Sequence, residues 1–523
     1  MKKSVTLLII LLFLLLTGCT AQQAKVESET QDQPVTVRLE GGDWGYPQPF
    51  THYSRGPGYS KMYYIFDSLL EKDEKGLIPW LAEKWEVGED GKSFLFTLRP
   101  DINWHDGKAL TAHDVAFSFQ YYQQHHPVRI HSLVIDPTYL IRIEALTDQE
   151  VLFEVAESQA PFLEALGMVP IIPKHIWANI ADPKKFIDES ALIGSGPYQL
   201  TEYNKEQGLY RFQAYQDFWG PAAQVDVLEF IPVGDSILAL EKGEIHLADV
   251  PADLEKRFEE RANITLMEKP GYYGYRLIFN MERQPEFQSK EMRQAFAYAI
   301  DRQELVQKTA RGAAVAGSMG IVPPHHRWFH SNLPTYDVDL EKSLQLLSKA
   351  KEQGNEILKE PLKYQLLVGA DLEVRIGEVL KEQLHKVGIQ LDVVAADNKS
   401  RDSRIVEGNY QIALVGHGGW GGDPDYLRVR FASDLPTSIS GKVPGYANEQ
   451  VTELALRQLK EIDDEKRRDT IMQLQEILAK EVAEIPLYFT TGKTAYRHDI
   501  YGGWLHAYDH HNLTHNKLSF LAR

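Results

Sequence analysis

The chain contains a single cysteine, Cys19, so no disulfide within one molecule can hold its fold together. A chain of 523 residues without such crosslinks must be stabilised by burying apolar side chains. Its hydrophobic content of 43% is sufficient for this, and its length predicts two or three packed lobes instead of one core. The absence of crosslinks therefore favours a large globular body with more than one core.

The residues before the cysteine have the features of a removable export signal. Two lysines precede an almost continuous apolar run, Val5 to Leu16, which is shorter than the roughly 20 residues of a membrane-spanning helix. Leu16-Thr17-Gly18 before Cys19 resembles a bacterial lipobox, which implies cleavage there and a diacylglyceryl group on the thiol. We expect a lipoprotein signal peptide at 1–18 and a polar tether at 19–33, with lipid as the sole membrane contact. The alternative is a permanent N-terminal membrane anchor.

Charge and motifs exclude several functional classes. The net charge of −18 disfavours nucleic-acid binding, which depends on basic contacts to phosphates. The sequence contains no H-E-x-x-H motif and no P-loop, and Gly194-Ser195-Gly196 lacks the spacing of a nucleophile elbow. We interpret this glycine pair as a backbone crossover between lobes. We therefore expect neither an enzyme nor a resident cofactor, and a secreted hydrolase is a remote alternative.

Hydrophobic periodicity predicts mixed strands and helices. The span from Val374 to Val387 has helical spacing and ends at Gly388, and Ile389 to Val394 then alternates as a strand does. Such strand–helix–strand order predicts an α/β fold with parallel strand pairing. The pattern also predicts one amphipathic helix from Gln288 to Lys308 and another helix from Tyr63 to Leu70.

Several segments, in order along the chain, carry a family resemblance. They are Tyr64-Ile-Phe-Asp-Ser-Leu-Leu-Glu71, Pro79-Trp-Leu-Ala-Glu-Lys-Trp85, Asp90-Gly-Lys-Ser-Phe94, Thr97-Leu-Arg-Pro-Asp-Ile-Asn-Trp-His-Asp-Gly107, Leu110-Thr-Ala-His-Asp-Val-Ala-Phe117, Gly194-Ser-Gly-Pro-Tyr198, Asp217-Phe-Trp-Gly220, Phe279-Asn280 and Arg293-Gln-Ala-Phe-Ala-Tyr-Ala-Ile-Asp301. Together they resemble the large extracytoplasmic solute-binding receptors of peptide and nickel ABC importers. The resemblance covers nearly the whole chain after the tether.

The resemblance implies a two-lobed α/β fold, of the large type II class of periplasmic binding proteins, with an extra domain inserted in lobe one. Lobe I would comprise 34–62, 196–280 and 490–523, with the inserted domain at 63–195 and lobe II at 281–489. Ligands of this family bind between the lobes, and closure produces the shape that the membrane permease recognises. We expect a monomer at the extracytoplasmic face of a bacterial cell membrane, with permease and ATPase subunits as partners.

A glycine-rich segment from Gly416 to Asp423 follows a predicted strand, Ile412 to Val415. Glycines such as Gly419 and Gly421 leave backbone groups open to an approaching chain, which suits pairing with an extended peptide. In the peptide-binding members of the family, a Trp at this place is followed three residues later by an Asp. Trp420 begins the matching pattern here.

The carboxylate in that pattern binds the α-ammonium of the peptide in the family, and Asp423 stands at the matching position. The segment is shorter than in typical peptide receptors, so Asp425 is an alternative. On the first lobe, Arg55 and Gly56 fall where the family supplies backbone to the ligand. Arg55 would meet a carboxylate there or would be solvated.

The 18 histidines raise the alternative of a metal chelate as ligand, because imidazole binds nickel, copper and zinc. The candidate ligands are His506, His510 and His511. Adjacent histidines on a strand point to opposite faces, which disfavours chelation by one pair. One nickel-receptor pattern has a Trp-Gly in the cleft, and Trp420-Gly421 satisfies this part of it. The same pattern has an arginine near the crossover of the first lobe, where Met168-Val-Pro-Ile-Ile-Pro173 offers none. Short peptides are therefore the first hypothesis and metal chelates the second.

Overall fold

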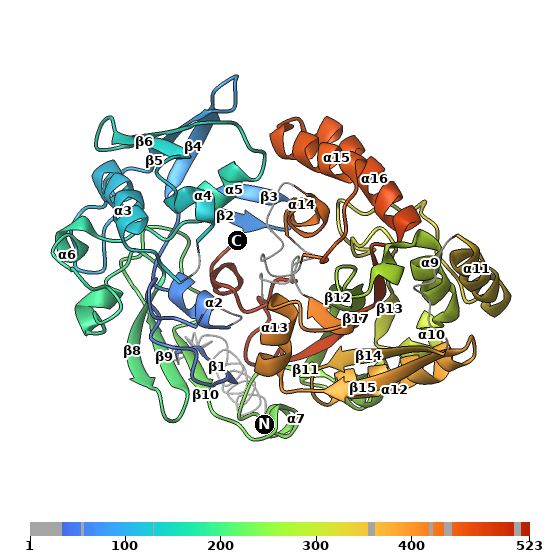
Figure 1. Cartoon of the computed structure of the whole chain (residues 1–523). Coiled ribbons are helices and arrows are strands. Elements are labelled where there is room, and N and C mark those ends of the chain that lie inside the picture. Colours follow the sequence, from blue (N-terminus) through green and yellow to red (C-terminus); the bar gives the residue numbers. More distant parts are fainter. Residues whose placement is uncertain are drawn as a thin grey trace, which may run out of the picture. The chain divides into compact units, whose positions relative to one another are not determined.

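The computed structural model describes residues 34–53, 57–128, 130–353, 361–417, 422–433, 442–506 and 514–523. The expected signal peptide, the tether and Cys19 lie outside them. Thr36–Arg523 form one compact unit, in which the described residues make four β-sheets (Figure 1). Among the described residues, no helix combines the length and apolar character required to cross a bilayer.

The first sheet has the strand order β1-β10-β9-β8, and its strands are β1 (Thr36–Glu40), β8 (Tyr198–Asn204), β9 (Leu209–Ala214) and β10 (Val227–Ile231). β1 is parallel to β10 and the other pairs are antiparallel. Buried and half-buried positions alternate along β9, as expected for a strand that packs one face on a core. The rings of Tyr64, Phe212 and Phe230 pack together on this core.

The segment between β1 and β8 folds into two further sheets. They are the hairpin of β2 (Leu70–Asp73) and β3 (Gly76–Pro79), and a sheet in the order β4 (Ala82–Val87), β5 (Ser93–Leu98), β7 (Glu150–Val155) and β6 (Leu140–Ala145). Helix α3 (Ala112–Gln124) packs against β6 and β7. The Thr111 backbone N–H donates to the Asp114 carboxylate at 3.0 Å, which fixes the start of α3.

The helix predicted from Tyr63 to Leu70 is wrong. The helix in this region, α2 (Pro57–Tyr63), ends where the predicted one begins, and β2 starts at Leu70. The carbonyl of Asp67 instead accepts the backbone N–H of Ile171, and that of Leu69 accepts the N–H of Ala82. The buried segment is thus held by neighbouring chain, and tertiary hydrogen bonds replace the helical ones.

The largest sheet has the order β11-β17-β12-β16-β14-β15. Its strands are β11 (Leu247–Val250), β12 (Ile264–Phe279), β14 (Leu362–Val368), β15 (Ile389–Ala395), β16 (Ile412–His417) and β17 (Glu484–Arg497), with β13 (Ala314–Ala316) paired to β17. The unit β14–α12–β15 contains the predicted helix as α12 (Leu372–His385), and its two strands are parallel. Gly388, at φ 82°, makes the turn from α12 into β15.

The two long strands β12 and β17 connect distant parts of this sheet. β11 pairs with the C-terminal half of β17, whereas β16 pairs with the C-terminal half of β12. The register between β12 and β17 shifts between Lys269 and Tyr273, opposite Gly492 and Thr490. A second shift lies between Tyr275 and Arg276, so the pairing of the two strands is interrupted at two places.

The single helix predicted from Gln288 to Lys308 is two helices, α9 (Lys290–Ala299) and α10 (Arg302–Ala310). The carboxylate of Asp301 accepts the backbone N–H of Glu304 at 2.9 Å and so begins a new helix. Periodicity alone did not reveal this break, because both helices bury apolar residues in the same core.

The remaining α-helices of the described residues lie along the whole chain. They are α4 (Ser132–Ile135), α5 (Phe162–Gly167), α6 (Lys174–Trp177), α7 (Ser236–Lys242), α8 (Glu255–Glu259), α11 (Leu340–Glu352), α13 (Asn398–Val406), α14 (Tyr426–Phe431), α15 (Glu449–Lys460) and α16 (Asp464–Glu481). Helices α15 and α16 pack side by side, and α14 contacts α15 (Figure 1).

Candidate functional site

The described residues line two neighbouring cavities of about 470 and 530 Å³, which share part of their walls. We call them together the cleft. The residues common to both cavities are Lys72, Pro161, Glu164, Gly422 and Asp423. One wall therefore comes from β2 and α5, and the other from the segment before α14.

The two cavities differ in the chemistry of their other residues. The first, the charged cavity, is lined among others by Asp73, Glu74, Lys75, Arg327, Asp464 and Arg467. The second, the apolar cavity, is lined among others by Tyr59, Tyr63, Ala165, Met168, Val169, Tyr426 and Val429.

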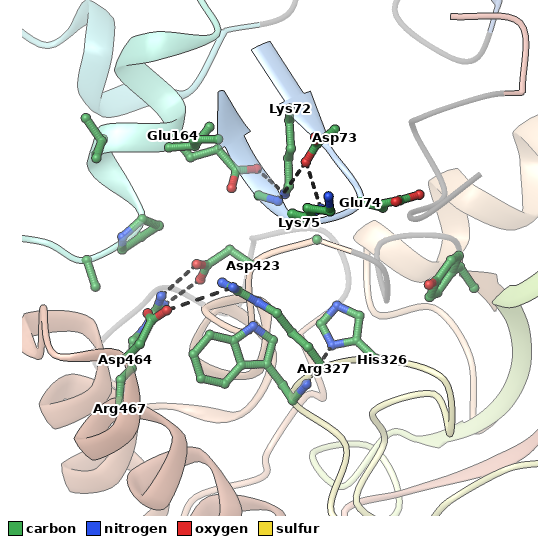
Figure 2. Close-up of a pocket in the computed structure, with 18 of the residues that line it drawn as sticks. Lys72, Asp73, Glu74, Lys75, Glu164, His326, Arg327, Asp423, Asp464 and Arg467 are labelled. Carbon is green, nitrogen blue, oxygen red and sulfur yellow. Dashed lines mark hydrogen bonds and ion pairs between the residues drawn. The ribbon is translucent and has the colours of Figure 1, made fainter. Parts of the chain in front are cut away.

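The β2–β3 hairpin places an ion pair on the first wall. The Lys72 ammonium lies 2.7 Å from the Glu164 carboxylate on α5, and both side chains are partly exposed to the cleft (Figure 2). The hairpin turn is held by the Asp73 carboxylate, which accepts the backbone N–H groups of Lys75 at 2.7 Å and Gly76 at 3.2 Å. The first wall thus presents a cation from the hairpin and an anion from α5.

The second wall carries the carboxylate of Asp423. Its two oxygens accept hydrogen bonds from the Arg467 guanidinium at 2.8 and 2.6 Å (Figure 2). The Arg467 side chain is only 4% exposed, whereas 23% of the Asp423 side chain is accessible. The carboxylate therefore faces the cleft, while its positive partner lies behind it on α16.

Asp425, the alternative carboxylate, occupies a different environment. It accepts hydrogen bonds from Arg428 at 2.9 and 3.0 Å and from the side-chain amide of Gln458 at 2.8 Å. It lines only the apolar cavity, whereas Asp423 lines both. Of the two, Asp423 is the more accessible to a ligand.

Trp328 packs under the arginines of the charged cavity. The Arg467 and Arg327 guanidinium carbons lie 5.4 and 4.7 Å from its ring centre, within the range of cation–π attraction. Arg327 also lies 3.9 Å from the exposed carboxylate of Asp464. The indole thus fixes the direction of both cations.

His131 precedes α4 and lies close to the carboxylates of the second wall. Burial lowers the pKa of His131, and the nearby carboxylates of Asp425 and Asp423 act in the opposite direction. Because the net shift is downward, the imidazole is neutral at pH 7. It adds no positive charge beside Asp423 under those conditions.

The two walls also touch directly beside the cleft. The backbone N–H of Ala160, before α5, donates to the carbonyl of Leu459 on α15 at 2.7 Å. This contact brings the first wall against the helix pair that carries Arg467.

Several residues predicted for the site lie outside the described residues. They are Arg55, Gly56, Gly419, Trp420, Gly421, His510 and His511. His506 is described, is exposed and lines neither cavity. In the parts of the chain that the structure describes, no three His, Cys, Asp or Glu side chains converge as a metal site would require.

Sequence reasoning missed Lys72, Glu164 and Arg467. The run Lys72-Asp-Glu-Lys75 between two apolar segments was a signal for a charged turn. Nothing local connects Arg467 with Asp423, because 44 residues separate them in the chain.

Comparison with known proteins places these features in context. Residues 76–438 match the family model described as bacterial extracellular solute-binding proteins, family 5 middle. The chain is 29% identical over 440 residues to the dipeptide-binding protein of Escherichia coli K12, an alignment that covers 78% of this chain and 80% of that protein.

Solved structures extend the likeness to nearly the whole chain. The ABC transporter substrate-binding protein CtaP of Listeria monocytogenes superposes with a TM-score of 0.78 at 23% identity, covering 93% of this chain and 98% of that one. NikZ of Campylobacter jejuni in complex with Ni(L-His) gives 0.72 at 20% identity, with coverage of 94% and 99%. These structures share the fold.

Proposed function

The chain belongs to the bacterial extracellular solute-binding proteins of family 5, and we propose that it captures short peptides in the cleft and delivers them to an ABC permease. Membership confirms the resemblance seen in the sequence, and the solved structures confirm the two-lobed α/β class. A family of solute-binding receptors also agrees with the expected extracytoplasmic location.

The observation that carries the peptide proposal is the arrangement of charges on the two walls. Lys72 and Glu164 stand on one wall, and Asp423, backed by Arg467, stands on the other. A short peptide is a zwitterion with a cationic and an anionic end. The first wall thus offers an ion of each sign and the second offers the Asp423 carboxylate, and charge-assisted hydrogen bonds in such a place contribute about 1.5–3 kcal/mol each.

Asp423 is the residue that we propose for the α-ammonium of the peptide. Arg467 binds both oxygens of the carboxylate and fixes its direction, while the accessible part of Asp423 faces the cleft. The neighbouring Gly419, Trp420 and Gly421 would offer backbone and an aromatic ring. Arg55 would receive the other end of the ligand.

We further propose that the ligand is held by closure of two lobes. In this division lobe I comprises 34–62, 196–280 and 490–523, with the inserted domain at 63–195, and lobe II comprises 281–489. The cleft lies between the inserted domain, which supplies Lys72, and lobe II, which supplies Asp423. Ligand contacts with both would shift the balance toward the closed form.

The proposal includes an anchor and partners. Residues 1–18 would be removed, and lipid on Cys19 would hold the monomeric receptor at the outer face of the cell membrane through the tether 19–33. The closed receptor would engage the permease and its ATPase subunits. We propose no catalytic activity.

Native mass spectrometry of the chain purified without denaturation tests the ligand class. A ladder of bound peptide masses is expected. A single mass that corresponds to a metal with a small chelator, as in the complex of NikZ with Ni(L-His), would contradict the peptide proposal and support the second hypothesis. Removal of the ligand by partial unfolding, followed by addition of tri-alanine, provides the control for binding competence.

A further inference from the structure

The cleft is divided by chemistry into a charged cavity and an apolar cavity, and this division bears on which peptides are selected. The two cavities meet at Lys72, Glu164 and Asp423. Among the described residues, the arginines that line the cleft, Arg327 and Arg467, belong to the charged cavity. A ligand that spans both cavities therefore meets ions at one end and apolar side chains at the other.

On the first wall, α2 supplies two tyrosines to the apolar cavity. Tyr59 and Tyr63 are four residues apart and so lie on one helix face, with ring centres 4.6 Å apart. The Tyr59 hydroxyl donates to that of Tyr63 at 3.1 Å, and the Tyr63 hydroxyl donates to the carbonyl of Met168. The hydroxyls are thus engaged with the protein, and the rings provide apolar surface to the cavity.

Residues of α5 and the segment after it complete the same wall. Ala165 is small and half-buried, and Met168 and Val169 follow at the end of the helix. Methionine adapts its shape to different apolar partners. In this part of the cavity, the small side chain of Ala165 leaves space and Met168 provides a surface that can change its shape.

The second wall contributes residues from one face of α14 to the same cavity. Tyr426 and Val429 are three residues apart on α14 and line the cavity together. Apolar groups from both sides thus line this cavity, together with Lys72, His131, Glu164, Asp423 and Asp425, and its volume of about 530 Å³ suits a large side chain.

We propose that the apolar cavity receives an aliphatic or aromatic side chain of the bound peptide, while the charged cavity and its boundary hold the charged groups. This inference rests on the proposed function as a peptide receptor. It makes the receptor selective for peptides with an apolar residue at one position and against peptides with a carboxylate there, because three carboxylates, Glu164, Asp423 and Asp425, also line this cavity and Lys72 is already paired with Glu164.

Calorimetric titration of the full-length mature chain with seven tripeptides tests the proposal. The probes are tri-alanine, three peptides with one Phe at each position, and three with one Asp at each position. One Phe peptide should bind roughly 10- to 100-fold tighter than the Asp peptide of the same position. Equal or weaker binding of all three Phe peptides would overturn the inference and leave the peptide receptor intact. Failure of all seven to bind would instead contradict the proposed function.

Two variants test whether the preference for one Phe peptide arises in the apolar cavity. Ala165→Phe fills the cavity, and Val429→Asp adds a charge to it, so each should reduce the affinity ratio between the preferred Phe peptide and tri-alanine at least fivefold. Ala178→Phe makes the same substitution at an exposed position outside the cleft and should preserve the ratio. Thermal melting establishes that each variant is folded. An unchanged ratio in both folded cavity variants would refute this placement.

Discussion

The Asp423 carboxylate is bound edge-on by the Arg467 guanidinium, with one hydrogen bond to each oxygen at 2.8 and 2.6 Å. The arginine is buried and also donates to the side-chain oxygen of Gln458 at 3.2 and 2.9 Å. The pair therefore fixes a negative charge at the cleft surface with its counter-ion behind it. Such a bidentate pair holds geometry better than a single contact does.

Asp423→Asn should weaken peptide binding at least tenfold, because the amide removes the charge that faces the ammonium. Asp464→Asn is the matched control, since Asp464 lines the same cavity but is 74% exposed and lies 3.9 Å from Arg327. Its effect should stay below roughly threefold because exposed ion pairs contribute little. Calorimetry with one bound peptide measures both. Equal effects of the two variants would remove Asp423 from the anchoring role.

Lys517 joins the C-terminal segment to the strand that carries the first wall. Its ammonium lies 2.7 Å from Asp67 and 2.5 Å from Glu71, and all three side chains are buried. Burial raises the pKa of Glu71, and Lys517 opposes that shift. Lys517→Met leaves two buried carboxylates without their cation and should reduce the free energy of unfolding by about 3–5 kcal/mol.

Lys493→Met provides the comparison for that prediction. Lys493 lies 3.0 to 3.8 Å from three glutamates but is partly exposed, so its removal should reduce the free energy of unfolding much less than Lys517→Met does. Urea unfolding of both variants measures the difference. Similar losses would show that burial does not govern the contribution of these lysines.

Lys61 gives the stability a distinctive pH dependence. Its side chain is fully buried, with the ammonium 3.8 Å from the centre of the Phe230 ring, and burial lowers the pKa of Lys61 to about 7. Between pH 7 and the unfolded pKa of about 10.5 the unfolded chain binds one more proton, so the free energy of unfolding rises with pH in that window. Below pH 7 this residue adds no further pH dependence.

Urea unfolding at pH 7 and pH 9 measures this effect. The wild-type free energy of unfolding should rise by about 2 kcal/mol more than that of Lys61→Met, because other groups contribute equally to both proteins. Parallel pH profiles for the two proteins would contradict the assigned shift.

Gly194 lies where two chain segments cross. A Cβ atom there would stand 1.9 Å from the carbonyl oxygen of Ile65, so Gly194→Ala forces the backbone to move and should destabilise the fold by about 1–3 kcal/mol. Gly502→Ala, at a position with no atom within 4 Å of the added Cβ, should change stability by less than about 0.5 kcal/mol. Thermal melting distinguishes them, and equal melting temperatures would exclude close approach as the reason for Gly194.

The sequence predicted the fold class and many elements because local patterns determine them. The helix before Gly388 and the strand after it were predicted because a positive-φ glycine separates two clear periodicities. The helix predicted from Tyr63 to Leu70 failed because tertiary hydrogen bonds override local preference there. The break at Asp301 was missed because an N-cap inside an apolar repeat leaves the repeat intact.

The cleft was predictable only in part. Asp423 was found because a motif of the family marks its position, whereas Arg467 and Glu164 belong to helices whose place in the cleft depends on tertiary packing. The spacing of Gly194 and Gly196 was recognised, but its cause is close approach to Ile65 and not an unusual backbone angle. A single sequence does not show which distant segments of the chain lie against one another.

Hydrogen–deuterium exchange with and without a tripeptide that binds in calorimetry tests the central claim most directly. If a peptide is held between the two walls, amides in the β2–β3 hairpin and α5 should be protected together with those of α14 and the start of α16. Protection confined to one wall, or located away from both cavities, would contradict the account.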